Sequence, residues 1–377
     1  MMEATLPYRL YLERGAFAAE RERIFGRQWF LVGRDEDVPG PGDWRRVDVA
    51  GEQLILVRGE DDRLRAFANT CRHRGAELCP ADGPEAGHAG RVLRCPYHHW
   101  TYGLDGRLRA APHLVQVPPD VALYEAGVAV WGGFTFVSLH PDQTPSLAEQ
   151  LGASVAATAN YPLADLRRGA RLAYEVAANW KVIVENYNEC YHCGPVHPEL
   201  CELVPAFRRG GGAGLEWDDG IPHRDGAWTF TSSGTSARAP FPGLSAEERV
   251  RHKGALVYPN LLLSLSADHV AAFTLLPRAP GHTTVVCDFL FAPEAIDAPD
   301  FDPTDAVDLW DLVNRQDWRI GESVQRGMSS YAADRGWFAP MEDDSADIGR
   351  WYRRAMGDDI AEVEDPPAAR EGEADRG

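Results

Sequence analysis

Two short stretches, Cys71-Arg72-His73-Arg74-Gly75 and Cys95-Pro96-Tyr97-His98-His99-Trp100, each place a cysteine close before a histidine. Each stretch offers one thiolate and one imidazole, which a two-iron cluster needs when cysteines bind one iron and histidines the other. Imidazole is neutral where thiolate is charged, so such a cluster is reduced more easily than an all-cysteine one, at about −150 to +300 mV. Structural zinc uses the same ligand types. The mixed order within each stretch and the flanking Arg-Gly and Pro-Tyr pairs favour iron–sulfur.

Strand and turn signals surround both stretches. Turn sequences at 39–43, 59–62 and 104–106 separate short apolar runs such as Leu54-Ile55-Leu56-Val57, which is the pattern of a small all-β domain. We assign residues 29–142 to this domain. Residues 1–28 are predicted to form a helical segment before it, because Tyr11 to Arg27 resemble an amphipathic helix.

A second group of candidate ligands lies within residues 185–197. Residues five apart on an unbroken helix point about 140° away from each other, so His192 and His197 share a metal only if the helix breaks between them. Gly194-Pro195 supplies such a break. We expect His192 at the end of a helix that begins near Asn179 and His197 on the loop after it. Glu189 is expected to orient the His192 ring.

A long helix is predicted to open at Asp302-Pro303. Strand-like runs at 228–231, 261–265, 270–276 and 283–291 precede this helix, and Pro280-Gly281 is the predicted turn of the last hairpin. The predicted apolar stripe of the helix contains Asp317 among Val307, Trp310, Val313, Ile320 and Val324. A charge on a buried face demands a partner. An iron held by two histidines is such a partner, and this ligand set leaves open positions for dioxygen.

With these residues in place, the sequence resembles the large (α) subunit of the Rieske non-heme iron oxygenases over nearly its whole length. Cys71, His73, Cys95 and His98 match the family motif C-x-H-R-G…C-P-Y-H-x-W. The resemblance implies an α+β protein with an N-terminal all-β Rieske domain and a C-terminal helix-grip catalytic domain, an antiparallel sheet with a long helix, at residues 143–356. His99 beside His98 leaves a ligand swap open.

The resemblance also implies the cofactors and their ligands. A [2Fe-2S] cluster would be bound by Cys71, His73, Cys95 and His98, and Fe(II) by His192, His197 and Asp317. Electrons would come from NAD(P)H through a reductase or a ferredoxin. The implied assembly is a homotrimer (α3), in which Glu189 bridges to His98 of the partner subunit.

Glu189 departs from the commonest family pattern, which looks to have aspartate at this position. The glutamate and the surrounding E-C-Y-H-C-x-x-x-H-P are similar to carnitine monooxygenase and to glycine betaine and stachydrine demethylating enzymes. The resemblance therefore implies that O2 is used to hydroxylate a small quaternary ammonium substrate, with N-demethylation or C–N cleavage. Aromatic faces would hold such a cation. The candidate pocket walls are Trp217, Trp228, Phe230, Tyr258, Phe273 and Trp310.

Three alternatives stay open. A ring-hydroxylating dioxygenase or monooxygenase acting on an aromatic acid would use the same metals, with an apolar slot for the ring. A Rieske electron carrier would need only the first domain. A zinc-stabilised binding protein would contain no labile sulfide.

Composition limits the possible partners and the location of the protein. The chain has 57 acidic and 38 basic residues, which argues against a nucleic-acid partner. No apolar run predicts a membrane span or signal peptide, so we expect a cytoplasmic protein without a membrane partner. Seven cysteines, an odd number, suit metal ligation in a reducing compartment better than a disulfide framework. Residues 357–377 are predicted to form an acidic, disordered tail.

Overall fold

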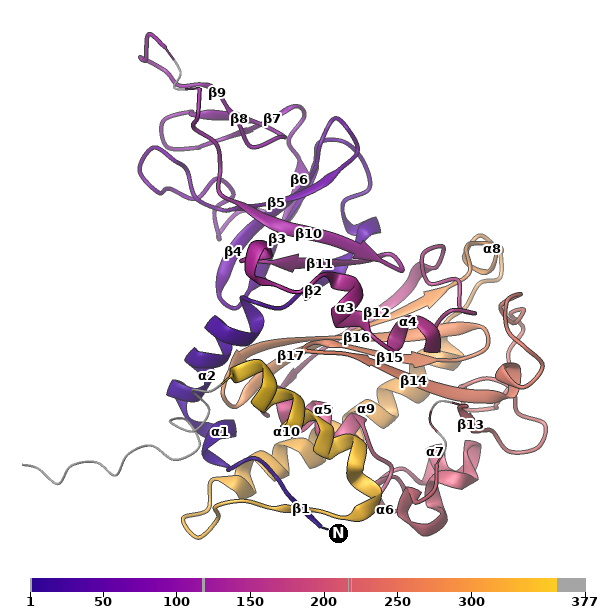
Figure 1. Ribbon diagram of the computed structural model, residues 1–377. Helices are drawn as coiled ribbons and strands as arrows, with labels where there is room; N and C mark the ends of the chain where they lie inside the picture. The colour runs from indigo at the N-terminus through magenta and orange to yellow at the C-terminus, as the bar shows by residue number, and fades with distance from the viewer. Residues whose placement is uncertain (1, 117–118, 216, 218, 358–377) are drawn as a thin grey trace, which may run out of the picture.

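The computed structural model describes residues 2–116, 119–215, 217 and 219–357 (Figure 1). The tail expected at 357–377 lies, apart from Gly357, outside these residues. In the part of the chain that the structure describes, no helix is both long enough and apolar enough to cross a bilayer.

The first part of the chain forms two antiparallel sheets. A seven-stranded sheet has the order β2-β11-β10-β5-β4-β3-β6, and a three-stranded sheet has the order β7-β8-β9. The strands are β2 Phe30–Arg34, β3 Asp43–Val49, β4 Glu52–Arg58, β5 Leu64–Ala68, β6 Ala86–His88, β7 Val92–Arg94, β8 Thr101–Gly103, β9 Leu108–Ala110, β10 Glu125–Trp131 and β11 Phe134–Ser138.

Strand β4 shows how this region is packed on both faces. Leu54 and Leu56 belong to the large core that continues into the rest of the molecule. Ile55 and Val57, which point to the opposite face, belong to a smaller core that also contains Cys71 and Cys95. An apolar core therefore supports the two stretches that carry the cysteines.

A six-stranded antiparallel sheet forms the second part, with the order β12-β17-β16-β15-β14-β13. Its strands are β12 Arg167–Val176, β13 Ile221–Pro222, β14 Arg251–Val257, β15 Leu261–Leu265, β16 His269–Ala279 and β17 His282–Phe291. The predicted hairpin turn at Pro280-Gly281 joins β16 and β17. The predicted combination of an all-β domain with an antiparallel sheet and a long helix is confirmed.

Three helices cover one face of this sheet (Figure 1). They are α5 Trp180–Tyr187, α9 Thr304–Met328 and α10 Asp343–Met356. Helix α9 begins close to the predicted position, because the Asp302 carboxylate accepts a hydrogen bond of 2.9 Å from the backbone N–H of Thr304. The shorter helices are α3 Leu147–Leu151, α4 Ser154–Ala157, α6 Cys193–Val196, α7 Pro198–Leu203 and α8 Pro293–Ile296, with 3-10 turns between them.

The N-terminal segment packs against the second part of the chain. Helices α1 Arg9–Leu12 and α2 Arg14–Glu20 and a π-helical turn, Arg21–Phe25, bring Glu20 into contact with α5 and α10. Glu20 accepts hydrogen bonds from the indole N–H of Trp180 at 2.9 Å and from the Tyr352 hydroxyl at 3.0 Å. It also forms an ion pair with Lys181, and both side chains are completely buried.

Three local predictions were wrong. The helix expected from Tyr11 to Arg27 is interrupted at Glu13, whose backbone is extended. Residues 228–231 form a loop in place of a strand, because Thr229 is buried and its hydroxyl bonds to Asp268. On α9, Val324 is exposed while Gln325 and Gly321 are buried, so the buried face turns away from the predicted stripe near the end of the helix.

We expect Glu20→Ala to lower the free energy of unfolding by about 3–5 kcal/mol, because it leaves the Lys181 ammonium buried without its carboxylate. Urea unfolding followed by tryptophan fluorescence measures the change. The control is Glu22→Ala, at an exposed position in the same segment, with an expected change within about 0.5 kcal/mol. Equal unfolding midpoints for the two variants would contradict the assigned role of the pair.

Candidate metal centres and substrate cavity

Helix α5 positions the first part of the site. Its N-cap residue Asn179 accepts a hydrogen bond of 2.9 Å from the backbone N–H of Lys181. The Asn179 amide also donates to the carbonyl of Pro280 at 2.7 Å. The start of the helix is thereby fixed to the turn between β16 and β17.

The helix ends before His192 and not at Gly194-Pro195, so the predicted position of the helix break was wrong. Helix α5 ends at Tyr187, and Gly194-Pro195 lies inside the short helix α6. The Glu189 carboxylate accepts hydrogen bonds from the backbone N–H groups of Tyr191 and His192, the second at 3.1 Å. This side-chain capping stabilises a turn in place of another turn of helix.

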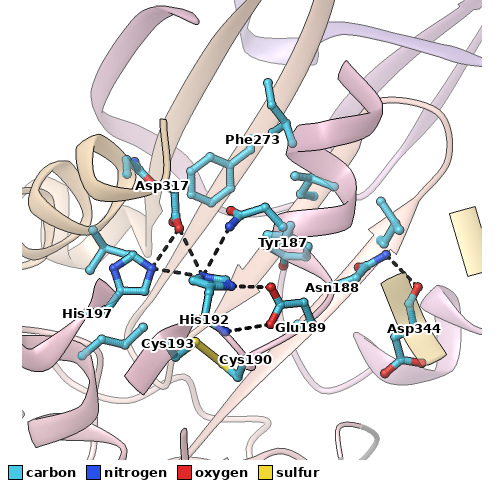
Figure 2. A pocket seen from close by; sticks show the side chains of 18 of the residues that line it. Tyr187, Asn188, Glu189, Cys190, His192, Cys193, His197, Phe273, Asp317 and Asp344 are labelled. Carbon is cyan, nitrogen blue, oxygen red and sulfur yellow. Dashed lines mark hydrogen bonds and ion pairs between the residues drawn. A yellow bond between two sulfur atoms is a disulfide. The ribbon is translucent and has the colours of Figure 1, made fainter. Parts of the chain in front are cut away.

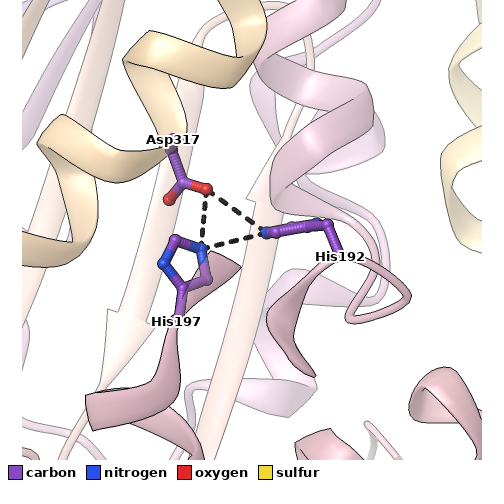
Figure 3. Close-up of side chains that lie close together, drawn as sticks. All are labelled: His192, His197 and Asp317. Atoms are coloured by element: carbon purple, nitrogen blue, oxygen red, sulfur yellow. Dashed lines mark hydrogen bonds and ion pairs between the residues drawn. The ribbon is translucent and has the colours of Figure 1, made fainter. Parts of the chain in front are cut away.

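Three side chains from two distant segments converge (Figure 3). His197 Nε2 lies 2.8 Å from Asp317 Oδ1, and His192 Nε2 lies 3.2 Å from the same oxygen. The two Nε2 atoms are 3.2 Å apart. Among the described residues, this is the only group of three or more His, Cys, Asp or Glu side chains whose donor atoms lie close enough together for one metal ion.

The second nitrogen of each imidazole is already occupied. Glu189 Oε1 accepts from His192 Nδ1 at 2.5 Å, and Gln316 Oε1 accepts from His197 Nδ1 at 2.7 Å. Both rings therefore present Nε2 to the same point. Hydrogen bonds of this kind fix the tautomer and orientation of a metal-binding histidine, so the arrangement fits a mononuclear iron.

The charges of the group also fit a cation. Burial alone would lower the pKa of His192, but the carboxylates of Asp317 and Glu189 raise it to about 10. Burial would raise the pKa of Asp317, but hydrogen bonds to the two imidazoles lower it overall. The metal-free group thus binds a proton tightly, and a metal ion would take the proton's place.

The two Cys-His stretches, at residues 71–75 and 95–100, form a second candidate metal centre. Cys71 and Cys95 are buried, whereas His73 and His98 are exposed. The His73 and His98 rings pack edge to face with centroids 4.7 Å apart, and His73 stacks on Trp100 at 4.9 Å. The Tyr102 hydroxyl lies 3.3 Å from Cys71 Sγ. Two cysteines inside and two histidines at the edge match the ligand division of a Rieske cluster.

His99 differs from His98 in its backbone. It has a positive φ of 58°, and its carbonyl accepts a hydrogen bond of 2.9 Å from the Thr101 hydroxyl. His98, by contrast, is the residue whose ring contacts His73. This geometry supports His98 as the ligand.

A cavity of about 360 Å³ adjoins the three converging side chains (Figure 2). Five of the six predicted pocket residues line it, namely Trp217, Phe230, Tyr258, Phe273 and Trp310. Trp228 does not. Because residues 228–231 form a loop, its ring packs against a separate core that contains Phe241 and Leu263.

Sequence reasoning missed several residues of this site. Gln316, beside Asp317 in the helix, could have been found as a polar neighbour of a predicted ligand. His252 on β14 lines the cavity, as do Asp344 and Asp347 on α10, and no local motif marks these residues. Their place in the cavity follows from the pairing of strands and the docking of helices that lie far apart in sequence.

Cys190 and Cys193 are joined by a disulfide and line the same cavity. Their sulfurs are therefore not available as thiolate ligands in this structure. The sequence favoured metal ligation in a reducing compartment over a disulfide framework, so this disulfide departs from that expectation. The five other cysteines are free.

Two known protein-family models match the two parts of the chain that carry the candidate metal centres. Residues 163–358 match the model described as ring hydroxylating alpha subunit (catalytic domain), and residues 28–125 match the Rieske [2Fe-2S] domain. The chain belongs to the Rieske ring-hydroxylating oxygenase α-subunit family. It is therefore an oxidoreductase with a [2Fe-2S] cluster and a non-heme iron, and it depends on electrons supplied by a reductase.

Individual relatives narrow the comparison. The chain is 31% identical to the glycine betaine monooxygenase oxygenase subunit of Chromohalobacter salexigens, over 93% of this chain and 86% of the relative. It is 38% identical to the carnitine monooxygenase oxygenase subunit of Escherichia coli, over 54% and 55% of the two chains. The fold is similar to that of the quaternary ammonium Rieske monooxygenase CntA in complex with L-carnitine, with a TM-score of 0.73, 26% identity and coverage of 94% and 96%.

We expect Asp317→Ala to remove the mononuclear iron and to preserve the cluster, because the cluster ligands lie on other loops. Iron analysis should fall from about three to about two atoms per chain, with an unchanged visible circular dichroism spectrum. Asp308→Ala, at an exposed position on the same helix, serves as the control. Full iron content in Asp317→Ala would show that another carboxylate completes the site.

Gln316→Leu should weaken Fe(II) binding by about 10- to 100-fold, since it removes the acceptor that orients His197. Competition with a chelator under anaerobic conditions measures the affinity. Gln316→Glu keeps an oxygen at this position and should retain most of the binding. If the leucine variant binds iron as tightly as the parent protein, the hydrogen bond does not orient the ligand.

Proposed function

We propose that this enzyme oxygenates a quaternary ammonium compound and releases an aldehyde by N-demethylation or C–N cleavage. The observation that carries the proposal is a cavity walled by aromatic rings beside the three-donor group. A quaternary ammonium has no N–H to donate, so ring faces provide its main attraction. The relatives named for glycine betaine and carnitine point to the same substrate class.

Several residues have roles in this proposal. Cys71, Cys95, His73 and His98 would hold the cluster, and His192, His197 and Asp317 the mononuclear iron. When bound, these groups supply electrons and activate dioxygen.

The reaction itself balances simply. Dioxygen, two electrons and two protons convert one N-methyl C–H into C–OH and produce one water. The C–N bond of the N-hydroxymethyl ammonium then breaks, which leaves a tertiary amine, formaldehyde and a proton.

The assembly belongs to the proposal as well. We propose a homotrimer in which Glu189 links the His192 ring to His98 of the partner subunit. The exposed position of His98 and the hydrogen bond between Glu189 and His192 support this route for electrons. A cytoplasmic location, where NAD(P)H and a reductase are available, fits the same scheme.

An aromatic acid is the second candidate substrate class. Its carboxylate would need a cationic partner, yet no Arg or Lys is among the described residues that line the cavity. The relatives also favour ammonium compounds over aromatic acids.

The test is dioxygen uptake by iron-loaded protein with NADH and a matched reductase, together with a formaldehyde assay. Betaines, carnitine, choline and a set of aromatic acids form the substrate panel. Uptake with equivalent aldehyde from an ammonium compound is expected. Uptake with aromatic acids alone would overturn the substrate class.

Glu189→Gln should leave both metal centres loaded and slow electron transfer by about 10²-fold, a loss typical of a misplaced catalytic contact. Stopped-flow absorbance of the reduced cluster during a single turnover measures the rate of reoxidation. The matched control is Glu202→Gln, an exposed glutamate on α7. A near-normal rate in Glu189→Gln would remove this side chain from the electron route.

A further inference from the structure

Four carboxylate residues, and no Arg or Lys, occur among the described residues that line the cavity. Two of the four, Glu189 and Asp317, bind the histidines of the metal site. The other two, Asp344 and Asp347, come from the first turns of α10. Figure 2 shows Asp344 on the far side of Glu189 from the three-donor group.

Asp347 lies next to the aromatic wall. Its Oδ2 accepts a hydrogen bond of 3.4 Å from the Tyr258 hydroxyl, and the Tyr258 ring stacks on Trp351 with centroids 4.5 Å apart. Asp347 thus places negative charge at the edge of a ring that faces the cavity. The pKa of Tyr258 is raised, by burial first and then by Asp347, as expected for a phenol beside a carboxylate.

Arg350 forms an ion pair with Asp347 that it shares with other carboxylates. Arg350 Nε lies 3.6 Å from Asp347 Oδ1, but Arg350 also pairs with Glu3 at 3.1 Å and with Asp343 at 3.0 Å. One guanidinium is therefore shared by three carboxylates. No arginine of α10 lines the cavity, whereas Asp344 and Asp347 of the same helix do, so the charged α10 residues that line it are acidic.

Besides its acidic residues, the cavity has a wall of aromatic rings, which is an independent reason for it to bind a cation. Phe230 stacks on Trp310 with centroids 4.8 Å apart, and Phe273 meets Trp310 edge to face at 5.6 Å. Trp217 packs on Phe207 at 5.9 Å, and both line the cavity. These rings attract a cation through their quadrupoles but provide no charge that would compensate an anion.

We infer that the enzyme selects ammonium substrates that carry a net positive charge and an uncharged remainder, and that it discriminates against zwitterions. This inference rests on the proposed function and deepens it. A carboxylate in the cavity would lose its water near Asp344 and Asp347, with no guanidinium or ammonium group among the described lining residues, which makes its burial unfavourable. A hydroxyl group in the same place would carry no such penalty.

Choline and glycine betaine form a matched pair for the test, because they differ chiefly in a hydroxymethyl group against a carboxylate. Dissociation constants are measured by isothermal titration calorimetry on the anaerobic, iron-loaded protein, and kcat/KM by dioxygen uptake. We expect choline to be favoured by about tenfold or more in affinity and in kcat/KM, because one uncompensated repulsion between like charges accounts for a change of that size. Equal or tighter binding of glycine betaine would overturn the inference.

Asp347→Asn tests the source of the selectivity. Loss of this charge should reduce the choline to glycine betaine affinity ratio by about fivefold, since it weakens an attraction for one ligand and removes a repulsion from the other. Asp308→Asn removes the same charge from an exposed position on α9 and should leave the ratio unchanged. An unaltered ratio in Asp347→Asn would contradict the inference, and the comparison of the two ligands on the parent protein needs no variant to fold.

The two proposals fail in different ways. Turnover of ammonium compounds with a preference for glycine betaine leaves the proposed function intact and overturns the charge selectivity. Binding that favours choline, without aldehyde from any ammonium compound, supports the selectivity and overturns the proposed reaction.

Discussion

A carboxylate on the inward face of a helix is the constraint on which the catalytic part of this molecule depends. Asp317 lies among the buried residues of α9, where an unpaired charge would be costly. Its partners, His192 and His197, come from a turn more than a hundred residues earlier in the chain. The sheet therefore has to hold α5 and α9 side by side, and the cavity forms where these two helices and the sheet face meet.

Much of this site could be predicted from the sequence, because metal ligation demands particular side chains at close spacing. The two Cys-His stretches and the His192, His197 and Asp317 set needed no knowledge of the tertiary structure. The path of the chain between them was harder to predict. The helix ends before His192 because backbone N–H groups donate hydrogen bonds to the Glu189 carboxylate. Such local capping competes with continued helix and moves the break away from Gly194-Pro195.

The aromatic wall was only partly predictable for a related reason. Phe230 and Trp228 are two residues apart and would share one face of a strand. In the loop that actually forms, Phe230 faces the cavity and Trp228 faces another core. His252 reaches the cavity through strand pairing and Asp347 through the docking of α10. No sequence pattern near either residue predicts these contacts.

The small sheet at the ends of the described chain has a consequence for the order of folding. Strand β1, Glu3–Ala4, pairs with β18, Trp337–Phe338, and Glu3 also binds Arg350 on α10. During synthesis, the N-terminal strand has to wait for a partner that leaves the ribosome more than three hundred residues later. The β domain carries its own core and can fold while the chain is still growing. The acidic side of the cavity is therefore assembled last, when both ends meet.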